Sequence, residues 1–310
     1  MNATAQLQRA RAALDLGRYD DAAREAGLAV AADPEGADGY YLLARSLFGL
    51  KRYREALGAI DTALTKEPDR AILHGTRSEV LRELEDYEGS MAEAEECLRL
   101  EPHSLLGPFC IGLTAHAQGN HDRALEALRE ALERSPSTAA LHYWLGETHR
   151  ARGEPALAEA CYRRSLALEP NDAACLNNLG VVLEAQRKRR EAVLAYKAAV
   201  LVDPTLHVAK QNTHRNLNKM LGPLGAVGAG SLVLVLKGLA SSKAVLWGIY
   251  VGARALTTPD AWGYVLAVGG LVALLFTGRW LVGRHRLRRS DPELLSLYHR
   301  LEADRQAGRL

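Results

Sequence analysis

Six prolines divide the first two-thirds of this chain into segments of equal length. They follow one another at intervals of 34 residues without a slip, at Pro34, Pro68, Pro102, Pro136, Pro170 and Pro204. A proline just past a helix end stops the helix, because it has no N–H to donate and its ring clashes with the preceding turn. The even spacing therefore predicts six copies of one supersecondary unit.

Other positions keep the same 34-residue register. Small residues lie twelve before the prolines, at Ala22, Ala56, Ser90, Ala124, Ala158 and Ala192, and five before them, at Ala29, Ala63, Cys97, Ala131, Ser165 and Ala199. Small side chains at fixed places let two helix backbones approach closely. Gly17, Gly119 and Gly153 mark a turn midway through three copies. Apolar residues are spaced as on helices, and no stretch before Pro204 alternates with period two, so the repeat region is predicted to be all-α.

This pattern resembles that of the tetratricopeptide repeat family. The best-matching copies carry Leu145, Gly146, Gly153, Ala158, Tyr162 and Pro170, and Leu179, Gly180, Ala192, Tyr196, Ala199 and Pro204. The resemblance implies a right-handed superhelical solenoid of helix-turn-helix units over residues 1–204, whose first helices line a concave groove. Two departures predict local changes in packing: Arg77-Ser78 replaces a Leu-Gly pair, and Pro155 occupies the place of an aromatic residue.

The resemblance also implies which side chains face the groove. These candidate partner-binding residues are Arg11, Tyr41, Arg45, Phe48, Glu79, Arg82, Phe109, Tyr143, Trp144, Glu147, Arg150, Asn177 and Asn178. They combine aromatic rings with charges of both signs. A protein or peptide ligand of mixed charge with apolar anchors fits such a surface better than a nucleic acid does. For Trp144, packing against a neighbouring helix is an equally good interpretation.

The composition changes abruptly after the repeats. Residues 1–204 carry a net charge of −7, whereas residues 205–290 carry +10 with Asp260 as the one acid. Residues 205–220 continue in a polar helical pattern and are expected to cap the last repeat. Residues 221–283 are predominantly apolar, which points to a membrane.

Two apolar segments are long enough to cross a bilayer, which takes about 20 residues. We expect Leu221–Ser242 and Ala261–Gly283 to form a two-span hairpin, with residues 244–256 spanning, lying in the interface or forming a loop. Basic residues flank both ends, with Arg284–Arg289 directly after the second span. Positive charge stays on the cytoplasmic side, so both termini are expected there. Residues 284–310 would then form a basic run and a cytoplasmic helix that begins near Pro292.

The sequence offers no set of residues at catalytic or cofactor-binding spacing, and we expect neither an enzyme, a cofactor nor a metal site. His142 and His149 share a helix face, but no third ligand is spaced to join them. The four cysteines have no paired spacing and occupy positions where the repeat takes small apolar residues.

The sequence therefore predicts a scaffold or adaptor anchored in a bacterial inner membrane, with its repeats in the cytoplasm and a protein or peptide in its groove. The alternative is a soluble oligomeric scaffold whose apolar C-terminal block is its assembly interface. A small-residue row at Gly222, Ala226 and Gly230 would also allow self-association in lipid.

Overall fold

The computed structural model describes residues 3–221 together with Arg300, Leu301, Ala303 and Ala307. Residues 3–221 form thirteen α-helices and contain no strand, which confirms the all-α prediction for this part of the chain. The predicted apolar hairpin and the C-terminal helix fall almost wholly outside the described residues. The helices are α1 (Ala3–Asp15), α2 (Tyr19–Ala32), α3 (Ala37–Gly49), α4 (Tyr53–Lys66), α5 (Ala71–Glu83), α6 (Tyr87–Leu100), α7 (Leu106–Ala117), α8 (His121–Arg134), α9 (Ala139–Ala151), α10 (Pro155–Leu168), α11 (Ala173–Ala185), α12 (Arg189–Val202) and α13 (His207–Leu221).

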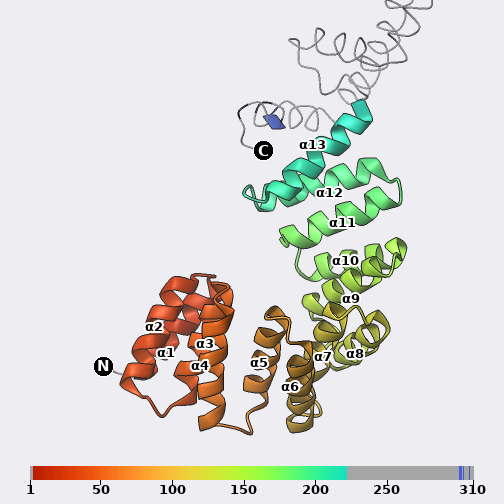
Figure 1. Ribbon diagram of the computed structural model, residues 1–310. Coiled ribbons are helices and arrows are strands. Elements are labelled where there is room, and N and C mark those ends of the chain that lie inside the picture. The colour runs from red at the N-terminus through yellow and green to blue at the C-terminus, as the bar shows by residue number, and fades with distance from the viewer. Residues whose placement is uncertain (1–2, 222–299, 302, 304–306, 308–310) are drawn as a thin grey trace, which may run out of the picture. The chain divides into compact units, whose positions relative to one another are not determined.

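The chain divides into two compact units, Met1–Pro170 with α1 to α10 and Asn171–Leu310 with α11 to α13. Within the first unit each odd-numbered helix pairs with the helix that follows it (Figure 1). The odd-numbered helices also contact one another along the stack, from α1 through α3, α5 and α7 to α9. In the second unit α11 pairs with α12, and α13 packs on α12. These are the contacts of a helical-repeat solenoid.

The prolines end the helices as the sequence predicts. Each even-numbered helix stops two residues before one of them, as α2 does at Ala32 before Pro34. The residue before the proline leaves the α conformation, because the ring of proline crowds that backbone. Pro155 causes no break, since it is the first residue of α10, where its missing N–H has no helical partner to lose.

The turn inside each helix pair has one geometry throughout. Its key residue has a positive φ, between 60° and 79°, at Gly17, Lys51, Glu85, Gly119, Gly153 and Arg187. In the α3–α4 turn, Arg52 N donates to Leu47 O at 2.9 Å and Lys51 N donates to Phe48 O at 2.9 Å. This pair of bonds is the Schellman motif, which satisfies carbonyls at the end of a helix. The sequence revealed only the three turns that use glycine.

Small residues in register are buried between the helices. Ala56, Ala124, Ala158 and Ala192 have no exposed surface. Glycine on a first helix faces a large side chain sixteen residues later: a Cβ on Gly146 would lie 2.7 Å from Tyr162, and one on Gly180 would lie 2.5 Å from Tyr196. In these two pairs of helices, the size of one side chain is therefore matched to that of the other.

The departure at Arg77-Ser78 is absorbed by a buried hydroxyl network. The Ser78 and Ser90 hydroxyls lie 3.0 Å apart, and Ser90 and Thr114 hydroxyls lie 2.8 Å apart. Ser90 Oγ also lies within donating distance of Ser78 O, at 2.8 Å. The serine that replaces a small apolar residue at position 90 thus finds partners inside the stack, and the fold is kept.

None of the helices in the described residues combines the length and the apolarity that a bilayer span requires.

Candidate functional site

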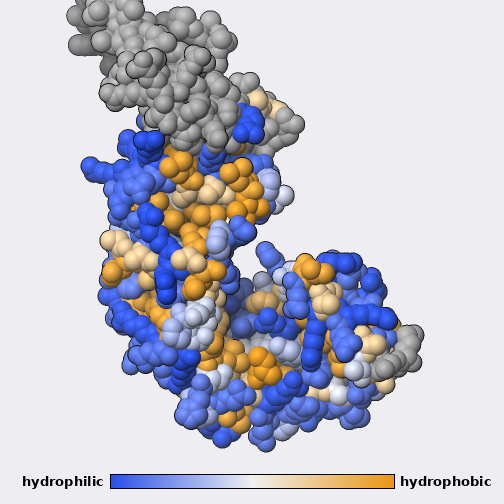
Figure 2. Space-filling view, turned by 180° about the vertical axis from the view of Figure 1, so that it is seen from behind, coloured by the Kyte–Doolittle hydropathy of each residue, from blue (hydrophilic) through white to orange (hydrophobic). Residues whose placement is uncertain are grey.

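The odd-numbered helices of the first unit carry all the predicted groove residues except Asn177 and Asn178. Figure 2 shows hydrophobic residues inside the hollow of this unit, between rims that are largely hydrophilic. Near its N-terminal end, α1, α3 and the end of α5 enclose a pocket of about 720 Å³ together with the turns that follow α1 and α3. Its lining is Arg11, Leu14, Asp15, Tyr19, Tyr41, Leu42, Arg45, Phe48, Gly49, Lys51, Tyr53 and Glu83. Four of these, Arg11, Tyr41, Arg45 and Phe48, are predicted groove residues.

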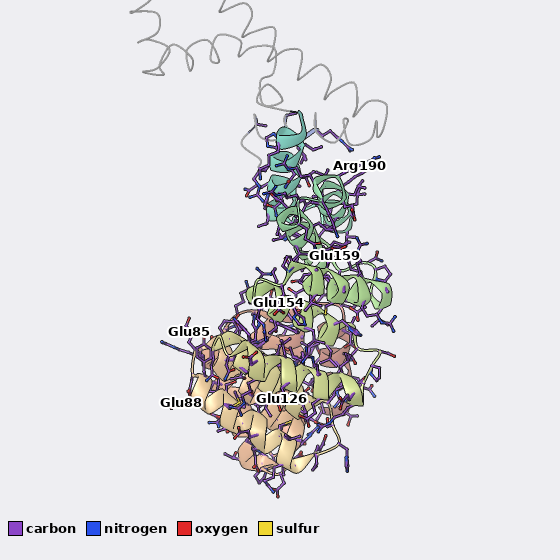
Figure 3. The ribbon with its side chains drawn as sticks, turned by 90° about the vertical axis from the view of Figure 1, so that its right-hand side faces the viewer. Glu85, Glu88, Glu126, Glu154, Glu159 and Arg190 are labelled. Atoms are coloured by element: carbon purple, nitrogen blue, oxygen red, sulfur yellow. The ribbon has the colours of Figure 1, made fainter. Side chains whose placement is uncertain are left out.

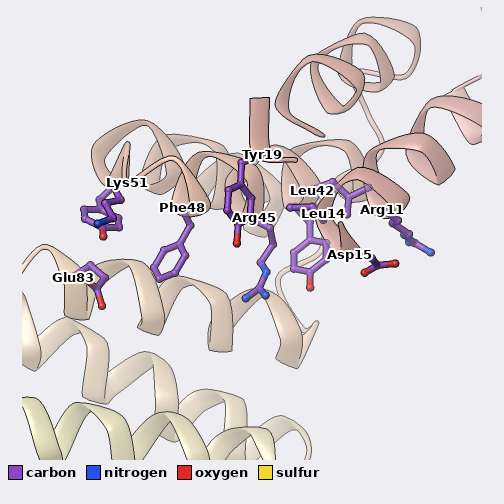
Figure 4. A pocket seen from close by; sticks show the side chains of 12 residues that line it. Arg11, Leu14, Asp15, Tyr19, Leu42, Arg45, Phe48, Lys51 and Glu83 are labelled. Atoms are coloured by element: carbon purple, nitrogen blue, oxygen red, sulfur yellow. The ribbon is translucent and has the colours of Figure 1, made fainter. Parts of the chain in front are cut away.

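Aromatic rings form much of the pocket wall (Figure 4). The Tyr19 ring lies directly against Gly49, where a Cβ would collide with it, and 39% of Tyr19 stays exposed. Phe48 and Tyr53 meet edge to face with ring centroids 5.5 Å apart. The guanidinium of Arg70 lies over the Tyr41 ring, 5.9 Å from its centre. Packing therefore holds these rings in place, so a ligand would meet a largely preformed apolar surface.

The charged groups of the pocket differ in what they already bind. Arg45 Nη1 donates to Glu79 Oε2 at 2.9 Å, and Arg11 lies 3.6 Å from Asp38. Lys51 and Asp15 have no ion-pair partner among the described residues, and Figure 4 shows them on opposite sides of the Tyr19 ring. Of the charged side chains that line the pocket, Lys51 and Asp15 are thus the two without an ion-pair partner among the described residues, and aromatic surface separates them.

The pocket floor continues into a charged row on α5. Arg82 Nη1 lies 2.8 Å from Glu83 Oε1, whereas Arg82 Nε is buried without a hydrogen-bond partner. Burial raises the pKa of Glu79 in spite of the neighbouring Arg45 and Arg82. Burial and the Glu83 carboxylate likewise raise the pKa of Tyr53.

The predicted groove aromatics on α7 and α9 are half-buried, as are Tyr41 and Phe48 in the pocket, which pack against the cluster that Ile60 and Leu73 help to form. Phe109 and Trp144 pack against the buried cluster that Leu128 and Leu141 help to form. Trp144 also meets His116 edge to face at 5.6 Å, so it contacts a neighbouring helix. Tyr143 meets both Trp144, at 5.5 Å, and Tyr162, at 6.0 Å.

Glu147 is 7% exposed and is held by two side chains. It accepts a short hydrogen bond from the Tyr162 hydroxyl and another from Arg150 Nη2 at 2.6 Å. Burial, together with the Glu147 carboxylate, raises the pKa of Tyr162. Of this group Arg150 alone is exposed and could reach a ligand.

Asn177 and Asn178 lie in the second unit, where α13 contacts the row to which they belong. Asn177 Oδ1 accepts from Asn212 Nδ2 of α13 at 3.0 Å, and Asn177 Nδ2 donates to Asn178 Oδ1 at 3.2 Å. The amide groups assigned to the groove are therefore already engaged within the chain.

Sequence reasoning missed the pocket residues that lie on turns and helix starts. Tyr19 and Tyr53 each fall fifteen residues before a proline of the repeat, as Tyr87 does. They reach the pocket because the turn after each first helix brings the start of the second helix to the groove rim. The recurrence of tyrosine fifteen residues before the proline was the sequence feature from which these pocket residues could have been predicted.

No group of three potential metal ligands occurs in the described residues. His142 Nε2 lies 3.3 Å from Pro136 O, and His149 Nδ1 lies 2.6 Å from Glu154 Oε2, so each has a local structural partner. Burial raises the pKa of Cys97 to about 11 and also raises those of Cys110 and Cys161. Thiols of this kind are poor nucleophiles and behave as small apolar side chains.

A profile of the tetratricopeptide repeat matches residues 7–71, 41–104, 111–173 and 148–205. Among solved structures, the Cut9–Hcn1 heterotetramer of the APC/C aligns with a TM-score of 0.61 and 17% identity over 70% of this chain, which spans 43% of that one. A tetratricopeptide repeat protein from Parabacteroides merdae aligns with a TM-score of 0.61 and 16% identity, over 70% of this chain and 85% of that one.

PilW, a type IV pilus biogenesis factor, aligns with a TM-score of 0.57 and 18% identity, over 67% of this chain and 97% of its own. At these identities the likeness is one of fold alone. No curated protein matches the chain.

Proposed function

We propose that this chain, which belongs to the tetratricopeptide repeat family, is a scaffold of six tandem repeats that holds a segment of a partner protein in the pocket of its first unit. The observation that carries the proposal is the pocket wall of Tyr19, Tyr41, Phe48 and Tyr53. Helix packing does not require aromatic rings at an open surface. Such rings offer a partner a large apolar area at low cost in side-chain entropy.

The charges of the pocket suggest what the bound segment looks like. Lys51 lies on one side of the Tyr19 ring and Asp15 on the other. A segment with an apolar or aromatic residue at its centre would contact the Tyr19 ring. An acidic residue on one side of that centre would pair with Lys51, and a basic residue on the other side would pair with Asp15. The pocket is lined by charges of both signs, with Arg11, Arg45 and Lys51 beside Asp15 and Glu83, so we propose a partner of mixed charge rather than a polyanion such as a nucleic acid.

The test is site-specific photocrosslinking in the cells that make the protein, followed by mass spectrometry of the adducts. A photoreactive amino acid replaces Tyr19 in the pocket, or Tyr87, its repeat equivalent outside the pocket. We expect position 19 and not position 87 to capture one recurrent protein. Capture of the same proteins at both positions would contradict the assignment.

The pocket is then tested by substitution against the captured partner. Tyr41→Ala and Phe48→Ala should each weaken binding by more than ~1 kcal/mol if these rings are hot spots. Charge reversal at Lys51 should weaken binding, whereas Glu85→Lys, at the matching turn outside the pocket, should leave it unchanged. Undiminished binding by a folded double variant of Tyr41 and Phe48 would refute the pocket as the site.

We further propose that residues 221–283 anchor the scaffold in a bacterial inner membrane, with the repeats in the cytoplasm. The support is the sequence alone: two largely uncharged segments, Leu221–Ser242 and Ala261–Gly283, and the basic run that follows the second. The competing proposal is a soluble oligomer assembled through the same apolar residues.

Alkaline carbonate extraction separates these two possibilities. An anchored chain stays with the membrane pellet, whereas a soluble oligomer is released and sediments as one species in analytical ultracentrifugation. In intact cells, cysteines placed between Arg284 and Arg289 should then react with a membrane-impermeant thiol reagent only after the inner membrane is permeabilised. We assign no catalytic activity to the chain, because the polar groups that meet in the described residues are engaged in structural pairs such as Glu147 with Tyr162.

A further inference from the structure

The second helices of the repeats share an exposed stripe, and on α12 this stripe has an unusual composition. Each stripe consists of four positions, separated in turn by four, three and four residues. Because an α-helix has 3.6 residues per turn, these positions lie within a narrow arc of the helix surface. On α12 they are Arg190, Leu194, the half-buried Lys197 and Leu201. Leu194 is 41% exposed and Leu201 is 71% exposed, although leucine is usually buried.

The matching stripes of the other helices show that the repeat does not demand this pattern. On α8 the stripe reads Asp122, Glu126, Arg129 and Glu133, and on α6 it reads Glu88, Ala92, Glu95 and Arg99. On α4 it reads Arg54, Gly58, Asp61 and Thr65, and on α10 Ala156, Ala160, Arg163 and Ala167. The α12 stripe alone among these combines two large apolar residues with two cations and has no acid.

Positive charge extends from this stripe into the turn before α12. Arg187, Lys188, Arg189 and Arg190 are all exposed, and the three arginines form no ion pair with any described residue. Figure 3 shows Arg190 projecting outward from α12, whereas the matching exposed residue of α8 is Asp122. Val202, which follows Leu201 at the end of α12, and Val208, near the start of α13, are also exposed, at 39% and 54%.

We propose that the outer stripe of α12, with the basic turn before it, lies on the surface of an anionic lipid bilayer. Cations that alternate with leucines on one helix face match the headgroup region, where the charges meet phosphates and the leucines enter the acyl boundary. A nucleic acid would use the cations and leave the leucines in water. The chain also passes from Val202 to the apolar residues that begin at Leu221 within twenty residues. The inference rests on the proposed membrane location of the protein.

The experiment uses the full-length chain with Cys161→Ala, reconstituted into lipid vesicles. A cysteine replaces Leu194 on the stripe, and matched controls carry it at Glu126 on α8 or Ala160 on α10, the same place in earlier repeats. Each cysteine carries an environment-sensitive fluorophore. The vesicles consist of phosphatidylcholine alone or with about one-third phosphatidylserine, and a lipid-borne quencher reports contact with the bilayer.

We expect emission from position 194 to shift to shorter wavelength and to be quenched in the phosphatidylserine vesicles, and emission from positions 126 and 160 to do neither. Replacing Arg187, Arg189 and Arg190 by Gln should lower the ratio of docked to undocked stripe by up to ~100-fold, or about fivefold for each cation.

The outcomes separate this inference from the proposed anchor. If the chain floats with the vesicles while position 194 stays unquenched, the stripe does not lie on lipid and the anchor stands. If the chain does not float with either kind of vesicle, both proposals fail. Equal quenching at position 194 with and without phosphatidylserine would overturn the role of the cations and with it the proposed anionic surface.

Discussion

The turn between α5 and α6 places a glutamate where two later turns place glycine. Glu85 has a φ of 64°, and Gly119 and Gly153, in the same register, have φ values of 79° and 77°. All these turns share the Schellman hydrogen bonds, such as Asp86 N to Leu81 O at 3.0 Å. We predict that Glu85→Gly stabilises the α5–α6 pair.

The magnitude follows from two opposing terms. An L-residue in the left-handed region costs about 1–2 kcal/mol, and glycine removes this cost. Glycine also gains freedom in the unfolded chain, which costs about 0.4–1 kcal/mol. The expected net gain is about 0.5–1 kcal/mol. A Cβ at Gly119 would meet nothing within 4 Å, so Gly119→Ala should lose a similar amount through its backbone alone.

The suitable assay is hydrogen exchange with mass spectrometry, because a repeat array opens locally and need not unfold in one step. Amides of α5 and α6 in Glu85→Gly should exchange about two- to fivefold more slowly, with little change in α1 and α2. Glu85→Ala is the matched control, since it removes the same carboxylate and keeps a Cβ. If Glu85→Ala protects these amides as well as Glu85→Gly does, the effect comes from the side-chain charge and the backbone argument is wrong.

Three further predictions concern packing, electrostatics and thiol reactivity. Gly180→Ala should cost about 1–3 kcal/mol in thermal denaturation, because the new Cβ would lie 2.5 Å from the Tyr196 ring, and adding Tyr196→Leu should recover part of the loss. The pKa of Glu184 is raised by its burial, but hydrogen bonds from Lys219, Asn216 and Arg215 outweigh this and hold it at about 2, below its usual 4.5. The protection of α13 against hydrogen exchange should therefore be full above pH 4.5 and should fall as the pH drops toward 2. The expected loss is about 1–2 kcal/mol, because the partners of Glu184 are partly exposed and solvent weakens their interaction. Glu184→Gln should abolish this dependence on pH. At neutral pH, alkylation should reach Cys97 and Cys110 only after denaturant is added; labelling of either in the folded chain would contradict their burial.

The parts of the fold that depend on neighbouring residues alone could be predicted from the sequence. Helix ends belong to this class, because Pro34 and its repeats act on the backbone directly beside them. The turns could be predicted only where they contain a glycine. Lys51 and Arg187 adopt the same left-handed conformation because the hydrogen bonds of the turn and the packing of both helices impose it. Their own chemistry gives no hint of it.

The candidate site was predictable to the extent that it follows the repeat register. Tyr41, Arg45 and Phe48 lie where the register places them, on the wall of the pocket. Register alone could not tell that Glu147 would be buried, since this depends on a tyrosine at position 162 that reaches it from the paired helix. Exposure is a property of several helices together, whereas a repeat pattern describes one helix at a time.

The contacts of α13 explain why the predicted groove residues of α11 are already bound within the chain, whereas the pocket of the first unit is open. α13 begins 34 residues after α11, at the place of another first helix, and no paired helix follows it in the described residues. Its Arg215, Asn216 and Lys219 all bind Glu184, and its Asn212 binds Asn177. A solenoid needs a polar end, because its last pair would otherwise expose an apolar face. Because α13 covers the last helix pair, its side chains bind Asn177 and Glu184 of α11, and these polar groups are no longer available to a partner. The pocket that we propose for a partner lies instead at the other end of the repeats, where Tyr19 of α2 and Tyr41 of α3 line it.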